Sequence, residues 1–212
     1  MTAVRRYEAS MYDSNRWDGF ELRPGDIIIS TPPKCGTTWT QMICALLILQ
    51  EPELPLPLDT LSPWIDMVTR ARTDVFADLE AQTHRRFIKT HTPLDGIPND
   101  PTVTYICVGR DPRDVGLSMG HHIDNTDIGA FLKQRERAAA IDGIEPGPLR
   151  PPRPRPGGGP EHWIDPAAFF SRGTSGQWRG LLDGAGLARY AARVRALASG
   201  NLVEWVHREP ID

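Results

Sequence analysis

Three residues near the start of the chain could bind an anion together. Lys34 lies in the short segment Thr31–Gly36, and Thr37 and Thr38 follow it directly. If a helix begins at Thr37, its first backbone N–H groups, the lysine ammonium and two hydroxyls converge on one point. The positive end of the helix dipole favours phosphate or sulfate there. The segment therefore predicts an anion site.

The order of residues in this segment argues against two common classes of anion-binding enzyme. A Walker loop needs Gly-Lys followed by Ser or Thr, whereas here Lys34 precedes Gly36, so a nucleoside-triphosphate hydrolase is disfavoured. A cysteine phosphatase would need an arginine six residues after its cysteine, but the residue at that distance from Cys35 is Gln41. The thiol is therefore not expected to be a nucleophile.

A second group, Lys89 and His91, ends a short apolar run. Histidine has an unperturbed pKa of about 6.5, so it can take a proton from a hydroxyl near neutral pH, and such a base contributes roughly 10²–10⁴ in rate. The ammonium groups of Lys89 and Lys34 can stabilise negative charge on a departing oxygen. A single histidine is more often an ordinary hydrogen-bonded side chain than a base, so the residue types alone leave the role of His91 open.

Arg110 and Ser118 form a third candidate group, for a phosphate. Arg110 follows another apolar run, and its guanidinium can bind phosphate with two parallel hydrogen bonds. Pro112 suits the first turn of a helix, which we expect at about Arg113–His122. Ser118 would then lie about two turns into that helix.

Short runs rich in β-branched residues predict the strands that position these groups, and they cover residues 27–29, 86–89 and 103–108. The apolar residues of Thr37–Gln50 predict a mostly buried helix, and Leu187–Ala198 predicts an amphipathic one. Strands separated by helices indicate an α/β fold, a three-layer α/β/α arrangement with a central parallel sheet. Ligands of such folds bind outside the carboxyl ends of the strands, where both strand-to-helix turns lie.

Composition limits the possible partners and organisation of the chain. Its 212 residues, 40% of them hydrophobic, suit a single domain spanning 1–212, with residues 145–160 as a Pro/Gly/Arg-rich linker or disordered loop. A net charge of −3 argues against a nucleic-acid partner. The apolar run Met42–Leu49 is too short to span a membrane. An odd cysteine count and no signal-peptide pattern favour a cytoplasmic location.

Three motifs resemble those of one family in the same order. Thr31–Trp39 (TPPKCGTTW) resembles the 5′-phosphosulfate loop of cytosolic-type sulfotransferases, which use 3′-phosphoadenosine 5′-phosphosulfate (PAPS). Ile88–Leu94 (IKTHTPL) resembles the segment with the catalytic lysine and histidine, and Arg110–Ser118 resembles the 3′-phosphate site. The chain is identified as a bacterial member with a P-loop-like sulfotransferase fold.

The resemblance implies a role for each matching residue. Catalytic roles fall to His91, as the candidate base, and to Lys34 and Lys89, in a reaction that requires no metal. PAPS binding falls to Lys34, Cys35, Gly36, Thr37, Thr38, Trp39, Arg110 and Ser118. In the family the equivalent of Trp39 stacks on adenine. The co-substrate would be PAPS, its product 3′,5′-adenosine bisphosphate (PAP), and the partner a small-molecule hydroxyl acceptor, with no metal.

The segment Phe169–Trp178 resembles the family's carboxy-terminal phosphate motif, and it implies further contacts from Arg172 and Gly173. Ser171 stands where the family usually has a basic residue, which predicts weaker affinity. The similarity covers roughly Arg6–Asn125 and Asp165–Arg208, and between them we expect mainly the proline-rich stretch in place of an internal segment. A truncated, catalytically silent homologue that at most binds the nucleotide is the alternative.

Overall fold

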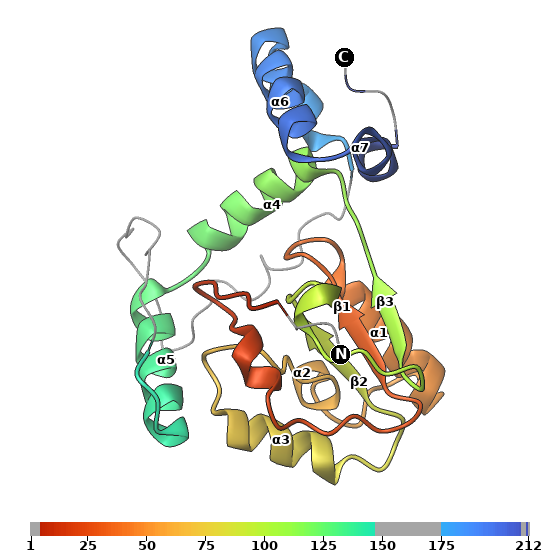
Figure 1. Ribbon diagram of the computed structural model, residues 1–212, viewed down its shortest axis with the longest axis vertical. Helices are drawn as coiled ribbons and strands as arrows, with labels where there is room; N and C mark the ends of the chain where they lie inside the picture. Colours follow the sequence, from red (N-terminus) through yellow and green to blue (C-terminus); the bar gives the residue numbers. More distant parts are fainter. Residues whose placement is uncertain (1–4, 147–174, 209–210, 212) are drawn as a thin grey trace. The chain divides into compact units, whose positions relative to one another are not determined.

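The computed structural model describes residues 5–146, 175–208 and 211 (Figure 1). The chain divides into two compact units. The first comprises Met1–Val108 and Thr126–Ile164, and the second comprises Gly109–Asn125 and Asp165–Asp212. No helix in the described ranges is long and apolar enough to cross a membrane.

The first unit is built on a three-stranded parallel sheet, which confirms the α/β fold class predicted from the sequence. Its strands are β1 (Ile27–Ser30), β2 (Phe87–Thr90) and β3 (Thr104–Cys107), in the order β2-β1-β3. Ser30 pairs with Thr90 on one side and with Cys107 on the other. The last residues of all three strands therefore lie side by side at one edge, where the candidate residues follow.

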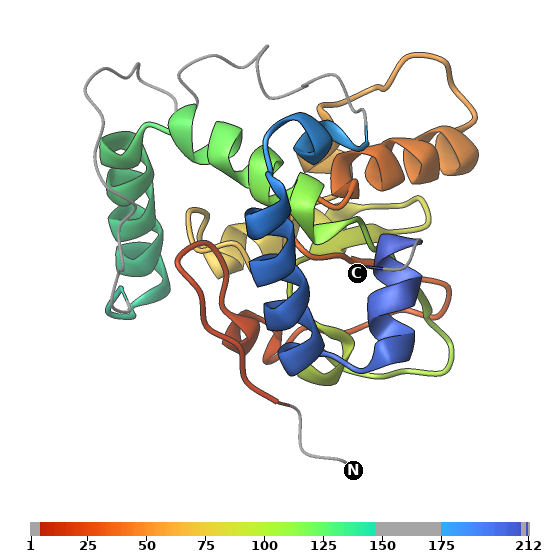
Figure 2. The same cartoon turned by 90° about the horizontal axis from the view of Figure 1, so that it is seen from above.

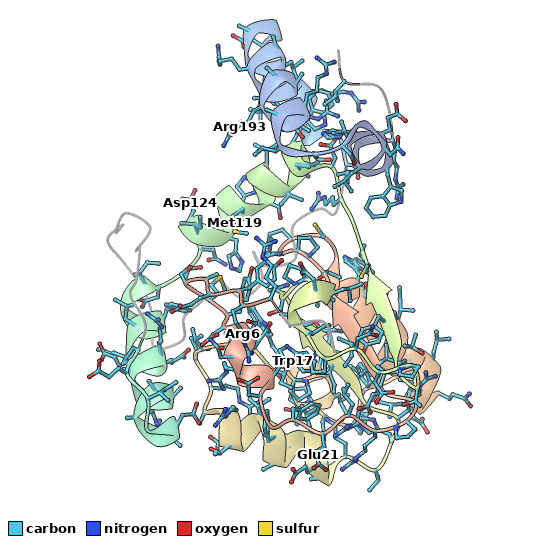
Figure 3. All side chains as sticks on the ribbon, in the orientation of Figure 1. Arg6, Trp17, Glu21, Met119, Asp124 and Arg193 are labelled. Carbon is cyan, nitrogen blue, oxygen red and sulfur yellow. The ribbon has the colours of Figure 1, made fainter. Side chains whose placement is uncertain are left out.

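Alternating side chains of β1 fill two apolar layers, one on each face of the sheet. Ile27 and Ile29 point toward α1 (Thr37–Leu49), where they pack with Cys44 and Ala45. Ile28 points to the opposite face, which is covered by Trp17 of η1 (Ser14–Trp17), by Phe20 after it, and by Val75 and Leu79 of α3 (Arg72–Ala81). Figure 2 shows α1 and η1 on opposite sides of the strands, and Figure 3 shows Trp17 among the side chains inside this unit. The period-two alternation places helices on both faces.

The prediction of a mostly buried helix at Thr37–Gln50 is right about the helix and wrong about its burial. One face of α1 is exposed, since Trp39 and Leu47 keep 69% and 72% of their accessible surface and Ile43 and Leu46 are also exposed. A helix that is apolar on all sides usually lies inside a protein, and for this reason its apolar sequence predicted burial. Only the face that carries Thr37, Gln41, Cys44 and Ala45 is buried.

Residues 128–142 form a helix in the region where the sequence predicted mainly a proline-rich stretch. This helix, α5 (Ile128–Asp142), belongs to the first unit. Asp142 at its end makes a buried ion pair of 3.0 Å with Arg16 and accepts a hydrogen bond from the backbone N–H of Arg72. The unit also contains two shorter elements, α2 (Leu58–Leu61) and η2 (Leu94–Gly96).

The described residues of the second unit form the helices α4 (Pro112–Asp124), η4 (Gln177–Gly180), α6 (Gly184–Leu197) and α7 (Gly200–His207). The predicted helices at 113–122 and 187–198 are confirmed as α4 and α6. Helix α6 begins earlier because Asp183 caps it, accepting a hydrogen bond from the backbone N–H of Gly186. Most of the predicted linker at 145–160 lies outside the described residues.

Candidate functional site

The loop between β1 and α1 is a tight turn with two residues in the left-handed region. Lys34 has a φ of 65° and Gly36 a φ of 95°, and the N–H of Cys35 bonds to the carbonyl of Pro32 at 3.3 Å. Gly36 is the N-cap of α1 and has no side chain with which to cap it. The first N–H groups of the helix are thus left without a capping side chain, as an anion site at a helix N-terminus requires.

A hydrogen bond between two threonines closes the base of this loop. The hydroxyls of Thr31 and Thr37 lie 2.5 Å apart, and both residues are buried. Thr40 adds a bond of 3.1 Å from its hydroxyl to the carbonyl of Gly36. These contacts tie the start of the loop to the first turn of α1, so the Lys34 backbone is held from both ends.

His91 lies directly after β2 and bonds to the first residue of the same loop. Its Nδ1 is 2.6 Å from the carbonyl oxygen of Thr31. Because a carbonyl oxygen can only accept, Nδ1 carries the proton, and in a neutral imidazole the lone pair then lies on Nε2. The side chain is 9% exposed. This tautomer is the one that can take a proton through Nε2.

Trp64 contacts two candidate catalytic residues, Lys89 on β2 and His91 directly after it. A short parallel bridge joins Trp64 to Lys89, with the Ile65 N–H and the Lys89 carbonyl 3.1 Å apart. The Lys89 Nζ lies over the indole at 4.2 Å from the ring centroid, a cation–π distance. The ring of His91 meets the indole edge-on, with centroids 4.5 Å apart. Sequence reasoning missed Trp64, because its position beside β2 depends on a pairing between distant segments.

The pKa of Lys89 is lowered to about 8, mainly because burial disfavours the ammonium. The negative charge of Asp66 raises this pKa, the positive charge of Lys34 lowers it further, and Asp59 raises it slightly. Lys34 on the loop is therefore close enough to affect Lys89 on β2. Two lysines whose positive charges repel each other are suited to a site that binds an anion.

The second unit carries the candidate phosphate residues Arg110 and Ser118. Arg110 precedes α4, and Ser118 lies inside this helix, in the relation that the sequence predicted. Asp111 caps α4 by accepting a hydrogen bond from the N–H of Arg113 at 2.9 Å. Figure 3 shows Met119 and Asp124 farther along the same helix.

Asp114 on α4 holds the neighbouring η4 through backbone contacts. It accepts hydrogen bonds from the N–H groups of Gly176 at 2.7 Å and Gln177 at 3.0 Å. The guanidinium of Arg113 lies 3.5 Å from the centroid of the Trp178 ring. Sequence reasoning did not find Asp114, and its two contacts order the end of the predicted phosphate motif. Arg172 and Gly173 of that motif lie outside the described residues.

The structure thus brings some of the predicted residues together and leaves others in a separate unit. Lys34, Lys89 and His91 gather at the carboxyl edge of the sheet in the first unit, whereas Arg110 precedes α4 and Ser118 lies within α4 in the second. The side chain of Cys35, within the loop, is buried. Trp39 is exposed on the first turn of α1, where a flat ring could stack on a ligand.

Comparison with known proteins shows which family this chain matches. The model of the sulfotransferase domain family matches residues 24–142, a span that holds the loop, all three strands and α4. A glycolipid sulfotransferase of Mycobacterium tuberculosis strain H37Ra is 58% identical over 113 residues, which are 53% of this chain and 35% of the relative. Sulfotransferase 1B1 of Canis lupus familiaris is 30% identical over 118 residues, covering 51% and 40%. The chain therefore spans well under half of the length of the curated relatives that it matches.

A solved structure shares the fold over nearly the whole chain. It is mouse sulfotransferase SULT7A1 complexed with PAP, which matches with a TM-score of 0.58 at 16% identity and covers 92% of both chains. At this identity the likeness concerns the fold.

Proposed function

The chain belongs to the sulfotransferase domain family, and we propose that it transfers a sulfuryl group from PAPS to a hydroxyl acceptor, with His91 as the general base. The observation that carries this proposal is the 2.6 Å contact between His91 Nδ1 and the carbonyl oxygen of Thr31. This contact holds the proton on Nδ1, so that Nε2 of the neutral imidazole can accept a proton. It also joins the base to the loop that would bind the donor.

The loop would hold the sulfate end of the donor. The first N–H groups of α1, the ammonium of Lys34 and the residues Thr37 and Thr38 provide donors for the oxygens of a phosphosulfate. The uncapped helix start and the left-handed Gly36 fit such a group, because no side chain occupies that position. Cys35 lines the same turn, and Trp39 on the exposed face of α1 would stack on the adenine ring.

The transfer requires one proton movement and one exchange of S–O bonds. The acceptor oxygen forms a bond to sulfur as its proton moves to Nε2 of His91, and the bond between sulfur and the bridging oxygen breaks. The bridging oxygen leaves on the phosphate with the bonding electron pair. Charge grows on that oxygen, and Lys34 and Lys89 would stabilise it more in the transition state than in the ground state.

The 3′-phosphate of the donor would bind at the start of α4. Arg110 can bind it bidentately, with Ser118 two turns farther along the helix. Arg172 and Gly173 would add the contacts of the carboxy-terminal motif. The mouse sulfotransferase of similar fold was solved in complex with PAP, which supports the choice of PAPS as donor.

We take a glycolipid hydroxyl as the first acceptor to test, because the mycobacterial relative carries that name. The acceptor is then a small molecule, and neither a nucleic acid nor a membrane-embedded segment is needed for the reaction. A metal is not needed either, because Lys34 and Lys89 would stabilise the negative charge that develops on the bridging oxygen.

A catalytically silent homologue is the second candidate, and one observation favours it. The matched region is 35% of the mycobacterial relative's length, so most of that relative has no counterpart in the match. Such a protein would bind the nucleotide without turning it over.

Two measurements on the full chain test the proposal. Calorimetry with PAP should show binding, which separates the two candidates above from a protein that does not bind the nucleotide. Turnover of PAPS against phenols, sterols, sugars and glycolipids should then produce a sulfated product. Binding without turnover for any acceptor would favour the silent homologue.

A further inference from the structure

Asp66 is a fully buried carboxylate that the proposed chemistry does not use. It accepts hydrogen bonds from the hydroxyls of Thr90 and Thr92 at 2.5 Å, from the N–H of Thr92 at 3.1 Å and from Nε1 of Trp64. Burial raises the pKa of Asp66, and the bonds from Thr90, Thr92 and Trp64 counteract that rise. A carboxylate with this many donors is expensive to bury and rigidly held.

The residues that Asp66 binds alternate along the chain with the two candidate catalytic residues. Lys89 and Thr90 end strand β2, so their side chains point to opposite sides of the sheet, and His91 and Thr92 follow the strand. Because the hydroxyls of Thr90 and Thr92 both bond to Asp66, the residues on either side of His91 are held by one carboxylate. Asp66 thereby fixes the direction in which His91 leaves the end of β2.

Trp64 provides the second link from Asp66 to the same pair. Its Nε1 donates to Asp66, while its ring lies under Nζ of Lys89 at 4.2 Å and meets the His91 ring at 4.5 Å. An indole held at its nitrogen cannot rotate about its side-chain bonds without losing that bond. The ring therefore gives Lys89 and His91 one shared, fixed surface.

We propose that Asp66 is a positioning residue, which fixes the Lys89 ammonium and the His91 imidazole relative to each other through Trp64, Thr90 and Thr92. The effect of Asp66 on catalysis rests on the proposed sulfuryl transfer, whereas the effect of Asp66 on the protonation of Lys89 does not. The charged groups that act on Lys89 are Asp66, Lys34 and Asp59. Of the two carboxylates, Asp66 is buried and joined to the indole, and Asp59 is exposed.

The lysine side chains give a direct measurement that needs no activity. The lysines of this chain are Lys34, Lys89 and Lys133. In protein labelled with ¹³C-lysine, the Cε and Hε shifts report the protonation of each, and Lys→Arg variants assign them. Lys89 of the parent should titrate near pH 8. In Asp66→Asn this midpoint should fall by about 1 unit or more, because the nearby negative charge is lost.

Asp59→Asn is the matched control. It also removes one negative charge that acts on Lys89, but from an exposed position without contact to the indole, so the midpoint should fall by less than in Asp66→Asn. An equal fall in both variants, or an unchanged midpoint in folded Asp66→Asn, would overturn the proposal.

A second variant covers the case in which Asp66→Asn does not fold. Trp64→Phe keeps a ring beside Lys89 but removes the N–H that Asp66 holds, and phenyl attracts a cation more weakly than indole. The Lys89 midpoint should fall in this variant too. An unchanged midpoint would show that the indole does not act on Lys89 and would sink the proposed link.

Kinetics separate a positioning role from general support of the fold. If the parent turns over PAPS, Asp66→Asn should lower kcat at least about tenfold with an unchanged Kd for PAP, and Trp64→Phe combined with it should add little, because residues that act as a unit are not additive. Additive losses, or a loss of PAP affinity alone, would contradict the inference. A parent without turnover would refute the enzyme proposal. The lysine titration would still test whether Asp66 positions Lys89.

Discussion

His91 Nδ1 and the carbonyl oxygen of Thr31 lie 2.6 Å apart, although the two residues are 60 positions apart in the chain. The two strands that they follow are neighbours in the sheet, and Ser30 pairs directly with Thr90. The residues after this pair, Thr31 and His91, therefore lie at the same edge of the sheet. This contact couples the candidate base to the loop of Lys34. The predictions below follow from that coupling and from the groups around it.

Activity should fall above about pH 8, because the protonated form of Lys89 stabilises the departing oxygen. Burial lowers the pKa of Lys89 to about 8, so the ammonium is present below that pH and is lost above it. A profile of kcat against pH, measured with saturating PAPS and acceptor, checks this. A rate that stays level up to about pH 10, the ordinary range of a lysine, would show that the charge of Lys89 is not needed.

Removing Lys34 should raise the pKa of Lys89. The positive charge of Lys34 lowers that pKa at present, so Lys34→Ala moves the ¹³C-lysine titration of Lys89 upward from about 8. Lys133→Ala, which changes an exposed lysine of α5, should leave it in place. If both variants behave alike, the two candidate catalytic lysines do not share a site.

Gly36→Ala should weaken PAP binding and cost about 1–2 kcal/mol of stability, because Gly36 has a φ of 95°. A Cβ there would meet no atom within 4 Å, so the cost arises from the backbone alone. Gly120→Ala in α4 also adds a Cβ in open space, but at an ordinary helical φ. That control should gain up to about 1 kcal/mol. Urea unfolding and calorimetry with PAP measure both, and equal effects in the two variants would exclude a special role for the loop backbone.

Arg110→Ala should weaken binding of PAP by about 10-fold or more, as expected when a bidentate, charge-assisted pair is lost. Arg137→Ala, an exposed arginine on α5, should leave the Kd unchanged. The same comparison with adenosine 5′-phosphosulfate, which lacks the 3′-phosphate, should show no difference between parent and Arg110→Ala. A loss of affinity for both nucleotides would place Arg110 elsewhere than at the 3′-phosphate.

Asp26→Ala should destabilise the first unit by about 3–5 kcal/mol, because it leaves a buried arginine without its charge partner. Arg86 donates to Asp26 at 2.9 Å through Nε, and both side chains are 2% exposed. Asp18→Ala removes the partner of Arg6 in an exposed pair and should cost less than about 1 kcal/mol. Urea unfolding of both variants measures the contrast, which similar losses would contradict.

Local patterns were sufficient to predict the strands, α1, α4 and α6, because β-branched runs between turn residues and a proline at a helix start act over a few residues. Helix α5 was missed because its alanines and charged residues, such as Ala138 and Arg135, show no clear apolar stripe. The exposed face of α1 could not be predicted either, since exposure depends on what the rest of the chain covers.

The candidate site divides in the same way. His91, Lys34 and Lys89 were found because their motifs are short and contiguous in sequence. Trp64 and Asp66 were not found, because their role depends on a bridge between Trp64 and Lys89 that joins segments about 25 residues apart. Pairing of this kind is decided by the register of the sheet and not by local residue types.

The central claim is that His91 is the base of a sulfuryl transfer, and it is tested most directly with ³⁵S-labelled PAPS and the best acceptor of the panel. The parent and His84→Ala, which changes a histidine bonded to a backbone carbonyl at 3.0 Å, should form labelled product at similar rates. His91→Ala should lower kcat by roughly 10²–10⁴ while it still binds PAP. Labelled product formed by His91→Ala at the parental rate would contradict the account.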